Sequence, residues 1–174
     1  MDTLVYILGG FALVFLLSQG ANALGLGGGG SDTLEDLGGV VDLSATSPTV
    51  KIARAIAVAE GGYDAHGNNL SNGSRPSRNR NPLDMTADLI GRAIGKDGPF
   101  VQYATDADGW ANGYAQVNAW LEGNSRYHSS DSSIADLAGL NSETGFTTTD
   151  QQAWANTVAR VLGVSLETSL SEIA

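Results

Sequence analysis

The sequence predicts a mainly α-helical domain with little β structure, preceded by an N-terminal transmembrane helix. Residues 3–31 carry no charged side chain, and their first half is strongly apolar. After residue 47, apolar residues recur at helical spacing in several segments, whereas the alternation typical of half-buried strands is nearly absent. A chain of 174 residues suits one domain with a short appendage.

Composition excludes several kinds of site. The net charge of −10 argues against nucleic acid as the main partner, because a phosphate-binding surface needs a basic face. The absence of cysteine excludes disulfides, iron–sulfur clusters and thiolate zinc sites. With His66 and His128 as the only histidines, we expect no metal site and no cofactor.

The N-terminal segment has the length of a membrane anchor. A helix over residues 4–24 would be about 31 Å long, which matches the hydrocarbon core of a bilayer. The sequence "ANA" at residues 21–23 also resembles a signal-peptide cleavage site, but the N-terminus "MDT" has an acid and no basic residue. We therefore expect an anchor over residues 1–24, a Gly-rich tether and acidic spacer over 25–46, and a globular domain over 47–174. This arrangement predicts a single-pass membrane protein whose domain lies outside the bilayer.

The first helix of the domain is expected over residues 48–60. Ser47 can cap its N-terminus, Pro48 suits its first turn, and Gly61 and Gly62 can end it.

The middle of the domain has weaker patterns. Residues 61–81 are rich in Gly, Asn, Ser and Arg, and they predict a long loop. The segment "MTADLIGRAIG", residues 85–95, predicts a short helix. The segment "PFVQYAT", residues 99–105, predicts one short strand.

Three further helices are expected in the second half. Residues 109–123 carry an apolar stripe at helical spacing. Residues 129–140 predict a short helix with Asp131 or Ser132 as its N-cap. Residues 147–164 predict a last helix that closes on a glycine. The stripe in the first of these segments consists of Trp110, Tyr114, Val117 and Leu121.

The first helix ends on a carboxylate, Glu60, which is unusual for an apolar helix. At 100° per residue, Glu60 lies within about 80° of Ile52 and Ile56, while Lys51 and Arg54 lie on the far side. Burial and the partial negative charge of the helix C-terminus both favour the protonated carboxyl. A carboxyl with a raised pKa can donate a proton to a leaving oxygen, as in glycosidic cleavage. The alternative is a partly exposed glutamate at a frayed helix end.

Four motifs occur in an order that resembles a known family. They are "AIAVAEGGY", "RNRNPLDMT", "DGWANGYAQVNAWLEG" and "VLGVSLETSL", and together they cover about residues 50–170. The order resembles the lytic-transglycosylase-type domains of bacteriophage particles, which belong to the lysozyme-like superfamily. Two positions depart from that pattern: Gly61 stands where a serine often follows the catalytic glutamate, and "NPLD" stands where Asn-Pro-Gly is expected.

The resemblance implies a lysozyme-like helical fold and assigns roles to residues. It makes Glu60 the catalytic acid and then the base in cleavage of the MurNAc–GlcNAc β-1,4 linkage. Asn81 would help to shape the saccharide groove, and Tyr103 and Tyr114 are candidates for contacts with sugar rings. Tyr114 also lies on an apolar stripe, which favours a core position.

A second acid and a basic cluster leave alternatives open. Asp64 and Asp84 could assist catalysis, or they could order the loop as Asx residues. Because no acid pair stands out, a single-glutamate transglycosylase is favoured over a lysozyme-type hydrolase. Arg78 and Arg80, in "SRPSRNRN", could bind peptidoglycan carboxylates or anionic lipid headgroups, or they could be solvated.

The sequence therefore predicts a membrane-tethered peptidoglycan lytic transglycosylase on a phage particle, opening the cell wall locally as the genome enters the cell. Its expected partners are peptidoglycan glycan strands, the membrane and other virion proteins. The alternative is a non-catalytic virion or envelope protein that retains a lysozyme-like fold.

Overall fold

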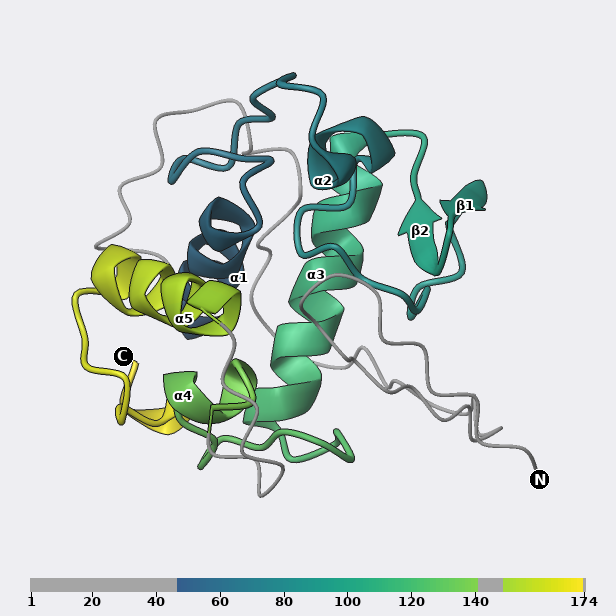
Figure 1. Cartoon of the computed structure of the whole chain (residues 1–174). Coiled ribbons are helices and arrows are strands. Elements are labelled where there is room, and N and C mark those ends of the chain that lie inside the picture. Colours follow the sequence, from purple (N-terminus) through teal and green to yellow (C-terminus); the bar gives the residue numbers. More distant parts are fainter. Residues whose placement is uncertain (1–46, 141–148, 174) are drawn as a thin grey trace.

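The computed structural model describes residues 47–140 and 149–173 (Figure 1). The predicted anchor over residues 1–24, together with the tether and spacer over 25–46, lies outside the described residues. Among the residues that are described, no helix has the length and apolar character needed to cross a membrane.

The described chain is mainly α-helical, as the sequence predicts. The elements are α1 (Pro48–Ala59), α2 (Arg75–Asn79), β1 (Gly95–Asp97), β2 (Phe100–Gln102), α3 (Asp106–Leu121), α4 (Ile134–Leu137), α5 (Thr149–Leu162) and the 3-10 helix η3 (Leu170–Glu172). The two strands form an antiparallel hairpin, in which Lys96 pairs with Val101. The strand expected within residues 99–105 is confirmed as β2.

Helix α1 lies at the centre of the domain, in contact with both α3 and α5 (Figure 1). Its buried positions include Ile52 and Ile56 and the alanines at 53, 55 and 57. All five residues are at most 3 % exposed. The small alanines let neighbouring helices approach closely, and burying the two isoleucines supplies about 1.5–3 kcal/mol each. The core around α1 includes Tyr63, Val101, Trp110, Val117, Trp154, Val158 and Leu170.

The prediction of a helix over residues 85–95 is wrong. The side chain of Asn112 in α3 forms hydrogen bonds with backbone groups of this segment. Asn112 of α3 accepts a hydrogen bond from the backbone N–H of Leu89 at 2.7 Å, and it donates one to the carbonyl of Ala87 at 2.9 Å. These bonds replace the ones that a helix would make within itself. The segment runs along α3 and leads into the hairpin.

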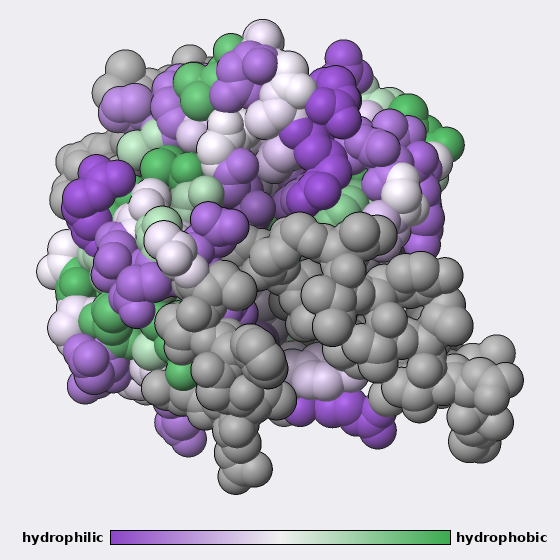
Figure 2. Space-filling model, in the orientation of Figure 1, coloured by the Kyte–Doolittle hydropathy of each residue, from purple (hydrophilic) through white to green (hydrophobic). Residues whose placement is uncertain are grey.

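The loop expected over residues 61–81 contains the short helix α2, which the sequence did not predict. Gly62 makes its docking possible: a Cβ on this residue would lie 2.7 Å from Pro76 Cβ and 2.9 Å from the backbone nitrogen of Ser77. The helix ends where Arg80 adopts a left-handed conformation with φ 49°. Hydrophilic side chains gather on the face where α2 and the hairpin lie (Figure 2).

The last helices and the C-terminal segment close the core from one side. The N-cap of α4 is Ser133, neither Asp131 nor Ser132, because Ser133 and Asp136 form a reciprocal capping box. Ser133 also forms an isolated antiparallel bridge with Ser169. This bridge holds the segment that carries the buried Leu170 against α4.

Candidate active site around Glu60

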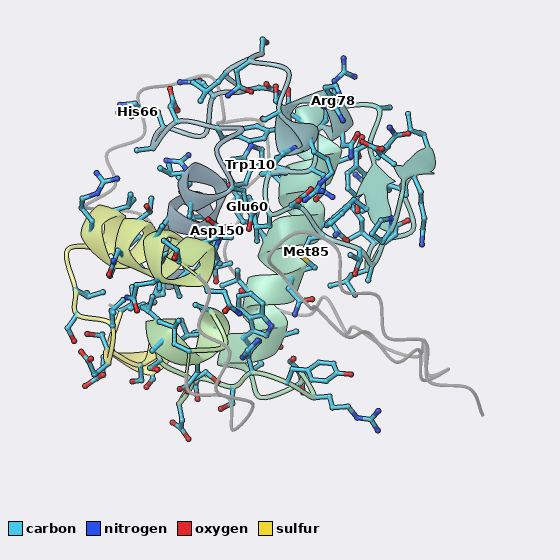
Figure 3. The ribbon with its side chains drawn as sticks, viewed as in Figure 1. Glu60, His66, Arg78, Met85, Trp110 and Asp150 are labelled. Atoms are coloured by element: carbon cyan, nitrogen blue, oxygen red, sulfur yellow. The ribbon has the colours of Figure 1, made fainter. Side chains whose placement is uncertain are left out.

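Glu60 is the C-cap of α1 and lies near the middle of the molecule (Figure 3). Its backbone N–H donates to the carbonyl of Ile56 at 2.9 Å, so the residue completes the last turn of the helix. The chain then turns away at Gly61, whose φ of +78° is the left-handed conformation that favours glycine. The carboxyl is thus presented at the end of the most buried helix, and the residue itself is partly buried.

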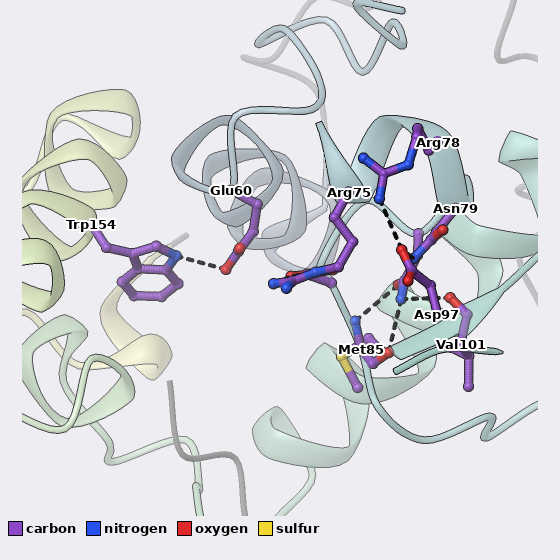
Figure 4. A network of polar contacts seen from close by, with 10 residues as sticks. Glu60, Arg75, Arg78, Asn79, Met85, Asp97, Val101 and Trp154 are labelled. Carbon is purple, nitrogen blue, oxygen red and sulfur yellow. Dashed lines mark hydrogen bonds and ion pairs between the residues drawn. The ribbon is translucent and has the colours of Figure 1, made fainter. Parts of the chain in front are cut away.

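Trp154 of α5 holds the Glu60 carboxyl from one side. Its Nε1–H donates a hydrogen bond of 2.9 Å to Glu60 Oε1 (Figure 4). The two residues are 94 positions apart and meet because α1 packs against α5. This bond fixes the orientation of the carboxyl while leaving its second oxygen for other contacts.

Arg75 lies on the other side of Glu60 (Figure 4). It forms an ion pair with Asp84. Arg75 Nε lies 2.9 and 2.8 Å from the two carboxylate oxygens of Asp84, and its Nη2 also donates to Asp84. The guanidinium packs over the ring of Phe100, with 3.5 Å between Cζ and the ring centroid. Asp84 is only 8 % exposed, so this pair is a fixed part of the surroundings of Glu60.

These surroundings raise the pKa of Glu60 from 4.5 to about 8. Burial is the largest cause, and the negative charge of Asp84 acts in the same direction. The hydrogen bond from Trp154 and the positive charge of Arg75 oppose the shift, because both favour the ionised carboxylate. At neutral pH the carboxyl is therefore mostly protonated, and it can donate its proton.

The raised pKa predicts that the domain loses stability as the pH rises. A folded-state pKa above the unfolded value means that the stabilising contribution is complete below about 4.5 and is lost progressively up to about 8. We expect the free energy of unfolding to fall by roughly 2–4 kcal/mol across this interval. Urea unfolding at pH 5 and pH 8 measures the loss, and the Glu60→Gln variant should show a clearly smaller one. An equal loss in both proteins would contradict the environment described for this carboxyl.

Asp64 and Asp84 have different roles, and Asp64 is a loop-ordering residue. Asp64 Oδ1 accepts hydrogen bonds from the backbone N–H groups of His66 and Asn68, both at 2.9 Å. Burial raises the pKa of Asp64, but the hydrogen bonds from Asn68 and His66 together outweigh it, so the pKa is lowered. Asp64 thus matches the Asx alternative, whereas Asp84 acts on Glu60 through its charge.

Asn81 does not face a saccharide groove, which corrects the expectation from the sequence. Its side chain is fully buried. Its Nδ2 donates to the carbonyls of Met85 and Val101 at 2.8 and 3.1 Å, and its Oδ1 accepts from the N–H of Met85 at 3.0 Å (Figure 4). Asn81 therefore joins the Asn-Pro turn to β2 and has a structural role.

The two tyrosines also differ from their expected role. Tyr103 is 2 % exposed, so it belongs to the core and cannot stack on a sugar ring in this conformation. Tyr114 is only partly buried, and its ring stacks on Trp110 with 5.5 Å between centroids. Tyr114 thus combines core packing with a face that lines a cavity, which is described below.

Arg78 and Arg80 lie on the surface and are not among the groups that contact Glu60. Arg78 Nη2 forms a 2.9 Å ion pair with Asp97, and its Nη1 donates to the carbonyl of Gly73 at 2.6 Å. Arg80 is exposed at the end of α2. The arginine that faces Glu60 is Arg75, and the only sequence signal for it was its membership of the same basic cluster.

In the described part of the chain, no three histidine or acidic side chains are grouped so that they could hold a metal ion. The groups placed around Glu60 are the indole N–H of Trp154 and the ion pair of Arg75 with Asp84. No known protein family, no curated protein and no solved structure matches this chain.

Proposed function

We propose that residues 47–174 form a peptidoglycan lytic transglycosylase in which Glu60 is the only catalytic carboxyl. The observation that carries the proposal is the Glu60 carboxyl at the end of α1, whose pKa is raised to about 8. A group that is protonated at neutral pH and is oriented by Trp154 has the properties of a general acid. The order of motifs that resembles phage lytic transglycosylases points to the same residue.

The proposed reaction uses Glu60 twice. First the carboxyl gives its proton to the glycosidic oxygen as the bond from this oxygen to C1 of MurNAc breaks, and the N-acetyl group of the sugar stabilises the cationic C1. The carboxylate then takes the proton of the C6 hydroxyl, whose oxygen bonds to C1 and closes a 1,6-anhydro ring. Arg75 favours the ionised state that Glu60 occupies between the two steps.

The neighbourhood of Glu60 favours this route over hydrolysis by an acid pair. A two-carboxylate hydrolase needs a second acid that is free to act as nucleophile or base. Asp84 is held by Arg75 through both carboxylate oxygens, and Asp64 is held by the backbone of its own loop. Neither acid is therefore arranged as the partner of Glu60.

The location of the activity is part of the proposal. Residues 4–24 of the sequence have the composition of a membrane span, and "GLGGGGS" that of a flexible tether. A domain held in this way on a phage particle would digest only the glycan within reach. Local opening of the wall fits such a tether better than complete lysis.

Product analysis tests the proposed function. The full chain, purified in detergent, is incubated with peptidoglycan, and the soluble products are analysed by mass spectrometry. We expect muropeptides that end in 1,6-anhydro-MurNAc. Products with reducing ends would identify a hydrolase instead, and the absence of any product would favour the non-catalytic alternative.

Two substitutions around Glu60 should move its pKa in opposite directions. Asp84→Asn removes a negative charge and leaves Arg75 without its partner, so the pKa of Glu60 should fall and the alkaline limb of activity should move to lower pH. Trp154→Phe removes a hydrogen bond to the carboxylate, so the pKa should rise and the limb should move to higher pH. The measurement is the rate of product release between pH 5 and 10. Shifts in the same direction would contradict the assignment of Glu60 as the acid.

A further inference from the structure

A polar cavity lies beside α1. Its volume is about 400 Å³, and its walls come from α1, from the loop after Glu60 and from the first turns of α3. His66 and Trp110, which both line it, are seen above Glu60 in Figure 3. The charged wall consists of Arg54 and Asp106, and Trp110 and Tyr114 form an aromatic wall. Neither Glu60 nor Arg75 lines this cavity, so it is separate from the proposed catalytic site.

Arg54 makes this cavity unusual. The helical wheel places Arg54 away from the buried stripe, yet the residue is only 2 % exposed. The loop after Glu60 covers it: a Cβ on Gly67 would lie 3.4 Å from Arg54 Nε and 3.4 Å from Trp110. The loop thus lies directly against the guanidinium, and the φ of +88° at Gly67 is the left-handed conformation that favours glycine there.

Two donors of this buried guanidinium are unused. Among the described residues, Arg54 Nε and Nη1 have no hydrogen-bond partner. Arg54 has a hydrogen bond with Tyr114, but its two remaining buried donors are costly to leave open, because buried charged groups in proteins are normally fully paired. Nε and Nη1 lie on different edges of the guanidinium, and each forms a planar fork with Nη2, so a bound anion that spans one of these forks would satisfy a donor that the protein itself leaves open.

The neighbouring acid does not fill this role. Asp106 Oδ1 accepts hydrogen bonds from the hydroxyl of Tyr63 and from Asn69 Nδ2, the latter at 2.9 Å. Asp106 and Arg54 form no ion pair in the described structure, although both line the cavity. The Asp106 carboxylate also disfavours a ligand with two negative charges, such as a phosphate monoester.

We infer that this cavity binds a carboxylate group, which accepts hydrogen bonds from Arg54. A carboxylate matches the planar geometry of a guanidinium and carries the single charge that Arg54 can balance. The stacked rings of Trp110 and Tyr114 provide an apolar wall for a methyl group or a sugar face beside the carboxylate.

The identity of the ligand that carries this carboxylate rests on the proposed function. Peptidoglycan offers two: the lactyl carboxylate of a muramic acid from which the stem peptide has been removed, and the terminal carboxylate of a stem peptide. Arg54 precedes Glu60 by six residues on one helix, which is about 9 Å along its axis. A carboxylate held by Arg54 would therefore belong to a part of the substrate next to the linkage that is cleaved.

Matched ligands test the inference on the full chain in detergent. Isothermal titration compares N-acetylmuramic acid with N-acetylglucosamine, and D-alanyl-D-alanine with its C-terminal amide. We expect at least one of the two carboxylates to bind at least tenfold more tightly than its neutral analogue, and the pair that does so identifies the source. Equal affinity within both pairs, or no binding by either carboxylate, would overturn the inference.

Variants locate the site. Arg54→Met should weaken carboxylate binding at least tenfold. Because Arg54 is buried, its substitution can also affect folding. A pair of variants at Ala107, an exposed residue that lines the cavity, avoids this problem. Ala107→Glu places a competing carboxylate in the cavity and should bind at least tenfold more weakly than Ala107→Gln, which has the same size without the charge. Equal binding by these two variants would contradict the site.

The inference and the proposed function can fail separately. Glu60→Gln leaves Arg54 and the cavity intact, so this variant should keep carboxylate binding whether or not the wild-type chain cleaves glycan. Binding without cleavage would refute the proposed function alone, and cleavage without carboxylate binding would refute the inference alone.

Discussion

Substitution of Glu60 by glutamine should reduce the release of anhydromuropeptides by on the order of 10²–10⁴-fold. Glutamine has nearly the same shape, and its Oε1 can still accept the hydrogen bond from Trp154. It cannot donate an acidic proton, nor can it remove the proton of the C6 hydroxyl afterwards. The measurement is the initial rate of product formation on purified peptidoglycan, determined by mass spectrometry with the full chain.

The matched control is Glu167→Gln, which makes the same chemical change at an exposed position near the C-terminus. This variant should keep the wild-type rate. Full activity in Glu60→Gln would show that another group transfers the proton, and the assignment of the acid would be wrong. A similar loss in both variants would point to a general effect of charge on substrate binding.

Gly109→Ala should be the most destabilising glycine-to-alanine change among the glycines that the structure describes. A Cβ at this position would lie 1.8 Å from the backbone oxygen of Arg80 and 2.9 Å from Pro82 Cδ. A glycine-to-alanine change within a helix usually stabilises it by up to about 1 kcal/mol. Here the neighbours are backbone and a proline ring, which cannot rotate away, so we expect a net loss of about 3 kcal/mol or more. Urea unfolding followed by circular dichroism measures it.

Gly113→Ala on the same helix provides a comparison. Its Cβ would approach Leu83 Cδ1 at 2.7 Å, and a leucine side chain can change rotamer. The loss of stability should therefore be smaller than for Gly109→Ala. If Gly109→Ala were as stable as the wild type, α3 would not pack against residues 80–82 as described, and the position of Asp84 beside the site would also be in doubt.

The positions of the main helices could be predicted because their signals are local. Apolar spacing placed α1, α3 and α5, and the pattern of Ile52 and Ile56 placed Glu60 on the buried side of its helix. Burial, which is the largest cause of the raised pKa of Glu60, was predicted from the same apolar pattern. The bond from Trp154 to Glu60 could not be predicted, because it depends on how two distant helices cross.

Other features could not be predicted, because they depend on contacts between distant segments. Residues 85–95 have a helical pattern, but Asn112 binds their backbone from α3. Arg75 is turned toward Glu60 by α2, a helix too short to be recognised by periodicity. Arg54 is buried by a loop that follows its own helix, and a helical wheel contains no information about that loop.

The central position of α1 has a consequence for how such a protein can diversify. The acid belongs to a helix enclosed by α3 and α5, whereas the loop residues around it, such as His66 and Asn68, are exposed. For the proposed glycosidase, substitutions in those loops would therefore alter contacts with the substrate without displacing Glu60.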